Sequence, residues 1–484
     1  MKIIKIAEQI KNAVFTGNRD LEITSVTCDS REAGEGSLFF CIKGFKADGH
    51  KFAKKAYEEG ARAFCISDNA EGVNGAEAII LSDDTRRAYA EASAAFYGHP
   101  AEKMTVTGVT GTNGKTTVTF MIDYIISKSG KKSGLIGTLC SKYGDRTITS
   151  SVTTPDAKTL HKTFADMTEN GVESVVFEVS SHSLSLDRVY GIKFDAAVFT
   201  NLTQDHLDFH KDFNDYFAAK SKLFKYLKED GYAIVNADDP YGKKIAAESK
   251  GRVITYGTCD CDFRASDIDV RRDGITYTLT YGKTSAKVEL GISGNFNVHN
   301  SMAAIATCSA LGISPEESSR ILRGFGGVKG RFELVKCGQE FAVAVDYAHT
   351  PDGLENVLKT AQKITDGKVI AVFGCGGDRD RTKRPIMGRI AAEFADLPII
   401  TSDNPRTEEP ESIISEIEKG MPEGKKYLKE ADRRKAIFLA LDKAEKGDTV
   451  VIAGKGHENY QIFKNETIHF DDAETAREYF SGRK

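Results

Sequence analysis

The stretch Gly108-Val-Thr-Gly-Thr-Asn-Gly-Lys115-Thr116-Thr117 decides how the chain must fold around it. It approximates the phosphate-loop pattern G-x-x-x-x-G-K-[ST], with five residues instead of four between Gly108 and Gly114. Residues 105–107 are typical of a strand end and residues 117–128 of a helix, which is the context that a phosphate loop requires. The stretch therefore predicts ATP or GTP binding, with Lys115 on the β- and γ-phosphates and Thr116 on Mg²⁺.

Length and composition limit the class of protein. A chain of 484 residues predicts about three domains, and 40% hydrophobic with 28% charged residues is typical of a soluble globular protein. The net charge of −4 implies no general affinity for nucleic acid. With no signal-peptide pattern, no apolar run of about 18 residues and scattered cysteines, we expect a cytoplasmic protein with reduced thiols and no membrane insertion. No heptad stripe indicates a coiled-coil partner. We expect a monomer.

Apolar runs divide the chain into three units. Residues 1–98 form a smaller α/β unit with strands expected at 37–42, 61–66 and 78–81 and a helix near 51–59. Residues 99–328 form a central unit, in which strands at 174–178, 196–200, 233–236 and 253–256 alternate with helical segments. That alternation predicts a doubly wound, mostly parallel sheet. Asp273-Gly274 lies between two further apolar runs and predicts an antiparallel hairpin.

The glycine-rich segment 324–330 marks the second boundary and is a plausible hinge. Residues 329–484 alternate again, with strands expected at 342–347, 369–374, 398–402 and 449–453. The fold class is therefore α/β with three domains: a small N-terminal unit, a central phosphate-loop unit and a Rossmann-like C-terminal unit. Ligands of open α/β sheets bind at the carboxyl ends of the strands, and the polar residues of the third unit cluster there.

Two central strands end in polar side chains. The strand 174–178 ends in Glu178, and the strand 196–200 leads into Asp205 and His206. Carboxylate and imidazole groups near a triphosphate indicate Mg²⁺ ligation. The alternative is helix capping by Asp205 or Ser180 within a solvated loop.

Four strand ends of the third unit carry Arg, Asn, Asp and Glu, in the stretches 346–351, 374–384, 403–406 and 454–458. A ligand with both a carboxylate and an ammonium would satisfy this mixture, because arginine binds carboxylates through a two-pronged fork. The alternative is a charged, solvated rim in which Asn-Pro forms a turn. Taken alone, the residues indicate an ATP-dependent enzyme with an amino-acid-like second substrate.

Several separate motifs together resemble those of the Mur ligases over essentially the whole chain. They are Gly111-Thr-Asn-Gly-Lys-Thr-Thr117, Thr153-Thr-Pro155, Glu178-Val-Ser-Ser-His182, residues 201–206, Asn297-Val-His-Asn300, Gly330-Arg-Phe-Glu333 and Asp346-Tyr-Ala-His-Thr-Pro351. The family's own phosphate loop has the glycine spacing seen here. The resemblance implies a UDP-binding first domain, an ATP-binding middle domain and a mobile third domain.

The resemblance also implies an amide ligase of peptidoglycan precursor synthesis. ATP would phosphorylate the D-Glu γ-carboxylate of UDP-N-acetylmuramoyl-L-alanyl-D-glutamate, and the amine of a diamino acid would attack the acyl phosphate. Lys115 and Mg²⁺ would supply the positive charge that brings two anions together.

Site residues follow from the motif positions. The implied catalytic residues are Lys115, Glu178, His206 and Lys220. The implied metal ligands are Thr116, Glu178, His206 and, if carbamylated, Lys220. The implied ATP contacts are Gly111, Thr112, Asn113, Gly114, Lys115, Thr116, Thr117, Asn297, Arg331 and Asp346. The implied contacts of the UDP-muramoyl peptide are Ser30, Phe45, Lys46, Ala47, Thr153, Thr154, Ser180 and Arg188. The alternative for Lys220 is an ordinary surface lysine on a helix.

The stretch Asp403-Asn-Pro-Arg406 resembles the family branch that adds meso-diaminopimelate. The implied amino-acid contacts are Arg379, Asp403, Asn404, Pro405, Arg406, Gly454 and Glu458. Lysine lacks the second carboxylate and would leave Arg406 without an anion, at a cost on the order of 1–3 kcal/mol.

Other functions remain as alternatives. A lysine-adding ligase is the nearest, and folylpolyglutamate synthase shares the architecture, although no pteridine signature is present. A phosphate-loop ATPase switch is a different class. A switch would hydrolyse ATP alone, whereas a ligase needs both cosubstrates.

Overall fold

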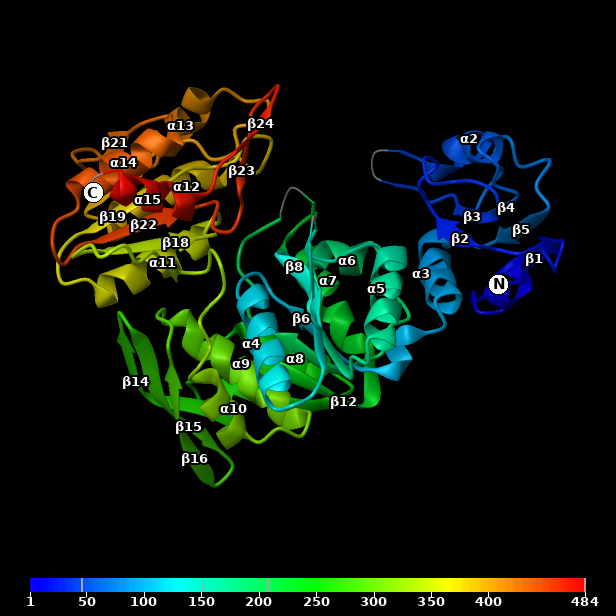
Figure 1. Ribbon diagram of the computed structural model, residues 1–484, viewed down its shortest axis with the longest axis horizontal. Helices are drawn as coiled ribbons and strands as arrows, with labels where there is room; N and C mark the ends of the chain where they lie inside the picture. Colours follow the sequence, from blue (N-terminus) through cyan, green and yellow to red (C-terminus); the bar gives the residue numbers. More distant parts are fainter. Residues whose placement is uncertain (45–46, 151, 207–208, 483–484) are drawn as a thin grey trace.

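The computed structural model describes residues 1–44, 47–150, 152–206 and 209–482, and it is built on three large sheets. Figure 1 shows them as three bodies along the chain, with the first (blue) on the right, the central one (cyan to green) below and the third (yellow to red) on the left. Helices accompany each sheet, so the predicted α/β class with three sheet-containing units is confirmed.

The first sheet has five strands in the order β1-β5-β4-β3-β2, and only the β1–β5 pair is antiparallel. Its strands are Val14–Gly17 (β1), Ser25–Thr27 (β2), Ser37–Phe40 (β3), Ala63–Ile66 (β4) and Ala78–Leu81 (β5). Its helices are Ile3–Ala7 (α1), Ala53–Glu58 (α2) and Thr85–Phe96 (α3), with a 3₁₀ turn at Gly49–Phe52. The two edge strands β1 and β2 were not predicted, because β1 is mostly exposed and β2 has only three residues, which leaves too little apolar pattern in either.

The central sheet has eleven strands in the order β16-β15-β14-β13-β12-β11-β6-β10-β7-β8-β9. Its parallel strands are Thr105–Thr110 (β6), Ser133–Ile136 (β7), Ser174–Glu178 (β10), Phe194–Phe199 (β11), Leu227–Asn236 (β12) and Arg252–Gly257 (β13). Antiparallel ribbons extend both edges: Cys140–Tyr143 (β8) with Arg146–Thr149 (β9), and Phe263–Arg271 (β14) with Gly274–Tyr281 (β15) and Thr284–Leu290 (β16). Strand β7, the ribbon β8–β9 and strand β16 were not predicted.

The predicted hairpin is present with a shifted turn. Arg271 pairs with Gly274, so the two-residue loop is Arg272-Asp273 and Gly274 opens β15. A side chain at Gly274 would place its Cβ 2.5 Å from the carbonyl oxygen of Leu290 on β16. The glycine is therefore required by close packing of the third strand and not by the turn itself.

Two layers of helices cover the central sheet. They are Lys115–Lys128 (α4), Ala157–Glu169 (α5), Ser181–Ser185 (α6), Phe213–Lys225 (α7), Pro240–Glu248 (α8), Phe296–Ala310 (α9) and Pro315–Leu322 (α10). Alternate residues of each strand face opposite layers: Val176 packs with α4 and α9, whereas Val175 and Phe177 pack with α5 and α7. The central domain therefore has the doubly wound arrangement that the alternating pattern predicts.

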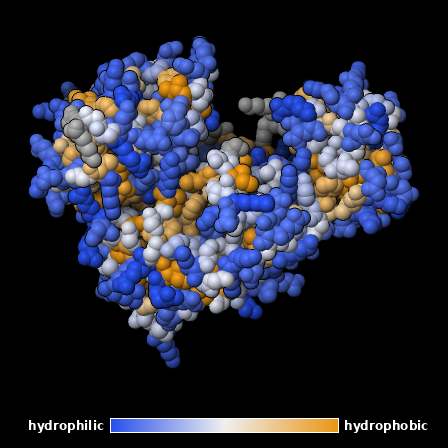
Figure 2. Space-filling model, viewed as in Figure 1, coloured by the Kyte–Doolittle hydropathy of each residue, from blue (hydrophilic) through white to orange (hydrophobic). Residues whose placement is uncertain are grey.

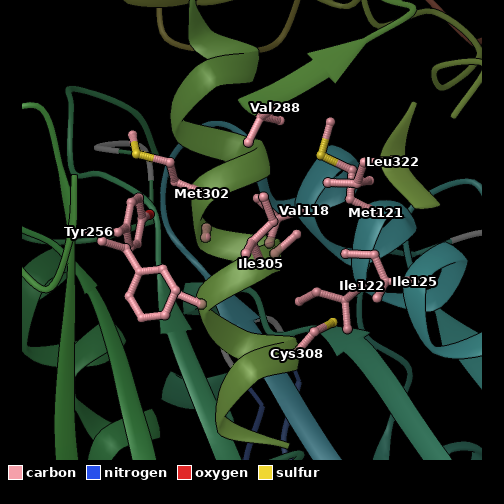
Figure 3. Packing of buried hydrophobic residues seen from close by; sticks show 14 of the residues in the cluster. Val118, Met121, Ile122, Ile125, Tyr256, Val288, Met302, Ile305, Cys308 and Leu322 are labelled. Carbon is pink, nitrogen blue, oxygen red and sulfur yellow. The ribbon is translucent and has the colours of Figure 1, made fainter. Parts of the chain in front are cut away.

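Helix α4 is held by its apolar face. Val118, Met121, Ile122 and Ile125 recur at helical spacing and pack against Met302, Ile305 and Cys308 of α9 (Figure 3). All seven side chains are fully buried. Because α4 begins at Lys115, this packing fixes the position of the phosphate loop.

The third sheet has the order β17-β18-β22-β19-β20-β21 and is parallel apart from β17. Its strands are Glu333–Leu334 (β17), Ala342–Asp346 (β18), Val369–Phe373 (β19), Leu397–Ile400 (β20), Leu428–Lys429 (β21) and Thr449–Ala453 (β22). Its helices are Pro351–Ile364 (α11), Lys383–Phe394 (α12), Pro410–Glu418 (α13), Arg433–Lys443 (α14) and Asp472–Ser481 (α15), and a hairpin joins Tyr460–Ile462 (β23) to Thr467–His469 (β24). The four predicted strands are present within two residues of their expected ends.

Hydrophilic side chains cover most of the face shown in Figure 2, and apolar residues form smaller groups between them. Among the helices of the described residues, none combines the length and apolar character needed to cross a membrane.

Candidate active site

The phosphate loop joins β6 to α4 and depends on two glycines. Gly111 and Gly114 have φ angles of +148° and +85°. A Cβ on Gly111 would lie 1.8 Å from Thr200 Oγ1, and one on Gly114 would lie 2.6 Å from Asn300 Oδ1. No side chain caps the start of α4, so its first N–H groups stay available to an anion.

The loop faces a cavity of about 690 Å³, which is within the usual size of small-molecule sites. The cavity is lined from the central and third domains together. Its lining residues include Thr112, Asn113, Gly114, Lys115, Thr116, Thr117, Thr138, Thr153, Glu178, Asp205, His206, Asn236, Tyr256, His299, Asn300, Arg331, Asp346, Tyr347 and His349. Most of the predicted nucleotide and metal residues therefore converge on one space.

The ammonium of Lys115 lies against the loop itself. Its Nζ donates to the carbonyl oxygens of Gly111 at 3.0 Å and Thr112 at 2.9 Å. Burial lowers the pKa of Lys115, while the charges of Glu178 and Asp205 oppose that shift. The ammonium therefore lies at the wall of the cavity, hydrogen-bonded to two carbonyl groups of the loop.

Glu178 ends β10 as a buried carboxylate surrounded by donors. It accepts hydrogen bonds from Thr116 Oγ1 at 3.0 Å, from Thr138 N at 2.8 Å and from Thr138 Oγ1 at 3.1 Å. One carboxylate beside a threonine hydroxyl and a phosphate-binding loop is the kind of oxygen donor set that Mg²⁺ takes with phosphates. The residues present therefore fit a magnesium ion.

His206 lines the same cavity and has a left-handed φ of +56°. Its Nε2 lies 3.3 Å from Asp205 Oδ2. Desolvation lowers the pKa of His206 to about 3, so the imidazole is neutral at physiological pH, as a metal ligand must be. Among the residues that the structure describes, no group of three acidic, histidine or cysteine side chains forms a protein-only metal site.

Lys220 on α7 is only 1% exposed, so the alternative of a surface lysine is wrong. Its Nζ donates to the Gly111 carbonyl oxygen at 2.7 Å and lies 4.5 Å from the centre of the Tyr216 ring. Burial, together with the charge of Lys115, holds the pKa of Lys220 well below its usual value. Lys220 lies behind the loop and does not line the cavity.

The residues predicted to hold the muramoyl peptide form one network beside Glu178. Thr154 Oγ1 donates to the Glu178 carbonyl oxygen at 2.8 Å and accepts from Ser180 N at 3.1 Å. Arg188 donates to the Thr154 carbonyl oxygen at 2.8 Å, and Thr153 Oγ1 lies 3.1 Å from Thr138 Oγ1, the hydroxyl that donates to Glu178. Ser180 also caps α6, which was the alternative interpretation of this residue.

The predicted UDP residues belong to the first domain. Ser30 is half-buried after β2, and Ala47 accepts a 2.8 Å hydrogen bond from Gly44 N. Phe45 and Lys46 lie outside the described residues. Neither Ser30 nor Ala47 lines the cavity at the phosphate loop.

Arg331 links the third domain to the phosphate loop. Its Nη2 donates to Thr116 Oγ1 at 3.1 Å, and its guanidinium lies 4.6 Å from the centre of the Tyr347 ring. Its Nε is buried without a partner, which leaves a donor for a ligand in the cavity. Asp346 accepts from Phe332 N at 2.7 Å and Ala348 N at 2.8 Å, and burial raises its pKa to about 6.

Asn297 lies behind the cavity wall. Its Nδ2 donates to the Ser293 carbonyl oxygen at 2.7 Å, and its Oδ1 accepts from Asn300 Nδ2 at 2.9 Å. Asn300, three residues later on α9, lines the cavity instead. His299 also lines it, with Nε2 2.8 Å from Asp238 Oδ2. The sequence predicted no role for Asn300 or His299, although both belong to the motif Asn297-Val-His-Asn300.

The predicted amino-acid residues lie at the carboxyl ends of β19, β20 and β22. Asn404 Nδ2 donates to Glu458 Oε2 at 2.9 Å. Arg406 has a φ of +53° and donates to the Gly377 carbonyl oxygen at 2.8 Å. Arg379 donates to the Asp378 carbonyl oxygen at 3.1 Å. These predicted contacts do not line the cavity at the phosphate loop, so the two regions are separate in this arrangement.

The rest of this set surrounds a lysine that sequence reasoning missed. Asp403 and Asn404 both lie within hydrogen-bonding distance of the fully buried Lys455, and Gly454 immediately precedes it. The carbonyl oxygen of Pro405 packs closely against Gly377, where an added Cβ would lie 1.9 Å from it, so residue 377 must be a glycine. No sequence signal marks Lys455 as buried.

Known proteins share this architecture and sequence. Residues 22–97 match the Mur ligase family catalytic domain, residues 109–308 the Mur ligase middle domain and residues 330–456 the Mur ligase glutamate ligase domain. A UDP-N-acetylmuramoyl-L-alanyl-D-glutamate–2,6-diaminopimelate ligase of Clostridium tetani is 46% identical over 99% of both chains. The enzyme of the same name from Bacillus licheniformis is 45% identical over 99% of both chains.

A solved structure of a protein with that name superposes with a TM-score of 0.69 at 32% identity and covers 95% of both chains. Similarity therefore extends over all three domains in sequence as well as in fold. On this evidence, together with the converging site residues, the chain belongs to the Mur ligase family.

Proposed function

We propose that the chain is an ATP-dependent ligase that joins meso-diaminopimelate to the D-Glu γ-carboxylate of UDP-N-acetylmuramoyl-L-alanyl-D-glutamate. The observation that carries the proposal is the meeting of three functional elements at one hydroxyl. Thr116 Oγ1 donates to Glu178 and accepts from Arg331, so the phosphate loop, the candidate metal carboxylate and the third domain share one point. Relatives named as this ligase support the same assignment.

ATP fits the cavity as the phosphoryl donor. Lys115, the N-terminus of α4 and the free Nε of Arg331 supply positive charge and donors for phosphates. Asn236, Tyr256, His299 and Asn300 line the same cavity and would face the rest of the nucleotide.

Magnesium would be held by Thr116 and Glu178, with His206 lining the same cavity. When bound, it would neutralise phosphate charge. Carbamylation of Lys220 would convert a cation into an anionic ligand, and its lowered pKa provides the neutral amine that this reaction needs. The modified group would have to act from behind the loop, because Lys220 does not line the cavity.

The chain's own residues would position the substrates. Thr153, Thr154, Ser180 and Arg188 lie beside Glu178, so a peptide carboxylate bound there would be next to the phosphate loop. An acyl phosphate formed there would be attacked by an amine brought by the third domain. Movement of the third domain would join the two regions, because the amino-acid residues do not line the nucleotide cavity.

Phosphate release tests the proposal directly. The assay would contain ATP, Mg²⁺ and the UDP-muramoyl dipeptide and would compare meso-diaminopimelate with L-lysine. Release only with diaminopimelate is expected. Release with lysine would support the ligase activity but reject the proposed specificity for diaminopimelate. Release with ATP alone would favour an ATPase switch.

We propose that the protein acts as a monomer. We also propose that it acts in the cytoplasm, where its nucleotide substrates are soluble.

A further inference from the structure

Lys455 places a fully buried ammonium among the residues proposed to bind the amino acid. Its Nζ lies 3.0 Å from Asn404 Oδ1, 3.3 Å from Glu458 Oε2 and 3.4 Å from Asp403 Oδ1. An isolated charge in such a position would be strongly unfavourable, so burial depends on these partners. The three acceptors match the three N–H donors of an ammonium.

The first consequence concerns the orientation of Asn404. Its Oδ1 accepts from Lys455 Nζ and, at 3.0 Å, from Ile462 N. Its amide nitrogen must therefore point away from both donors, and it donates to Glu458 Oε2 at 2.9 Å. If the side-chain amide of Asn404 were rotated by 180°, its NH₂ group would face the ammonium of Lys455, and two donors would oppose each other. One amide hydrogen remains for a ligand.

The second consequence concerns charge. Asp403 and Glu458 carry two negative charges, and Lys455 cancels one of them. The adjacent Arg433 is already balanced, because its guanidinium pairs with Asp472 at 2.7 Å with both side chains fully buried. The cluster of Asp403, Glu458 and Lys455 therefore has a net charge of −1, which matches a single ligand ammonium.

We propose that Lys455 is a positioning residue that sets the specificity of this cluster, an inference that rests on the proposed function. With Lys455 present, the cluster binds one ammonium group, and Arg406 on the adjacent loop is left to bind a carboxylate. The distal end of a diaminodicarboxylic acid carries both of these groups. Without Lys455, the carboxylates of Asp403 and Glu458 are both uncompensated. They then favour a ligand whose distal end carries a net positive charge. A diamino acid that lacks the distal carboxylate, such as lysine, then gains relative to diaminopimelate.

The test compares Lys455→Met and Lys455→Gln with the wild type. The measurements are kcat and KM for meso-diaminopimelate and L-lysine, at saturating ATP and UDP-muramoyl dipeptide and at amino-acid concentrations high enough to detect lysine turnover. In Lys455→Met, kcat/KM for diaminopimelate should fall about tenfold or more, mainly through KM. The diaminopimelate-to-lysine ratio of kcat/KM should fall by about tenfold, while KM for ATP stays within about twofold.

Lys425→Met is the matched control. Lys425 belongs to the same domain, and its Nζ donates to the Ala395 carbonyl oxygen at 2.7 Å, away from this cluster. Its amino-acid ratio should not change. Lys455→Gln keeps a donor for Asn404 but removes the charge, so its ratio should also fall, and it decides the result if Lys455→Met is too unstable to assay.

Equal losses for both amino acids, with an unchanged ratio, would overturn the inference and leave Lys455 a purely structural residue. That outcome leaves the wild-type ligase activity intact. If the wild type releases phosphate with neither amino acid, the proposed function itself is wrong and the inference falls with it. The two failures are therefore distinguished by the wild-type arm.

Discussion

The side-chain amide of Asn113, in the phosphate loop, donates a 2.6 Å hydrogen bond to the carboxylate of Asp352 at the start of α11. Thr203 Oγ1 donates to the same oxygen at 3.3 Å. The third domain is thus attached to the nucleotide-binding loop itself, close to the contact between Arg331 and Thr116.

Asp352→Ala should weaken this attachment and lower kcat by about tenfold, because Arg331 would be held less often at the loop. ATP affinity should change less than kcat, since the loop and Lys115 are intact. Steady-state kinetics and equilibrium ATP binding would measure both. Glu355→Ala is the control, because Glu355 also lies on α11 and forms an ion pair with Lys359 of the same helix. An unchanged kcat in Asp352→Ala would show that the contact is dispensable.

Gly111→Ala should abolish most nucleotide binding. The added Cβ would meet Thr200 Oγ1 at 1.8 Å, and Thr200 holds the loop by donating to the Asn113 carbonyl oxygen at 2.6 Å. Relief of the clash must displace Thr200 or the loop, so ATP affinity should drop by about tenfold or more. Gly130→Ala has the same need for a positive φ but no neighbour within 4 Å of its Cβ, and it should bind ATP normally. Normal binding by Gly111→Ala would contradict the steric argument.

Asp346 should make stability depend on pH. Its pKa is about 6 in the folded protein, compared with an ordinary value of 3.8. Between these values the folded state holds more protons than the unfolded state, so stability falls as pH rises from about 4 to about 6. The free energy of unfolding of the wild type, relative to Asp346→Asn, should decrease by roughly 3 kcal/mol across this window. Denaturant unfolding of the two proteins at each pH would measure this difference. A difference in free energy of unfolding that does not change with pH would exclude the effect.

The buried ion pair between Arg433 and Asp472 should be costly to break. Both side chains are fully buried, and Arg433 also donates to the carbonyl oxygens of Ala453 and Ser402. Asp472→Ala leaves the guanidinium uncompensated and should destabilise the third domain by about 3–5 kcal/mol. The double variant Arg433→Met with Asp472→Ala should be less destabilised than Asp472→Ala alone. Thermal and chemical unfolding would compare them, and equal losses would contradict a charge effect.

Arg406→Lys should weaken the use of diaminopimelate more than that of lysine. A lysine cannot form the two-pronged contact with a carboxylate that an arginine forms. The expected loss in kcat/KM for diaminopimelate is about tenfold or more. Arg381→Lys is the control, because Arg381 pairs with Glu416 on the exposed side of the same domain. Unchanged kinetics in Arg406→Lys would reject the role of this residue in specificity.

Local sequence determined much of the architecture. Buried parallel strands such as 174–178 and 449–453 are continuous apolar runs, which need no distant partner to be recognised. The glycines around Lys115 and the polar ends of neighbouring strands located the phosphate loop and Glu178 before any contact was known. Short edge strands and the β8–β9 ribbon escaped prediction, because few residues and partial exposure leave little pattern.

Tertiary structure decided the state of individual side chains. Lys220 and Lys455 carry side chains that are usually exposed, yet both are buried. Asn297 does not line the cavity itself and contacts Asn300, which does. The order β22-β19-β20 places the ends of β22 and β20 on either side of β19, which brings residues 403–406 and 454–458 together from distant parts of the chain. Periodicity and turn chemistry act over a few residues and so can be read from sequence. Burial of a charge depends on which strands become neighbours, and only the folded chain fixes that.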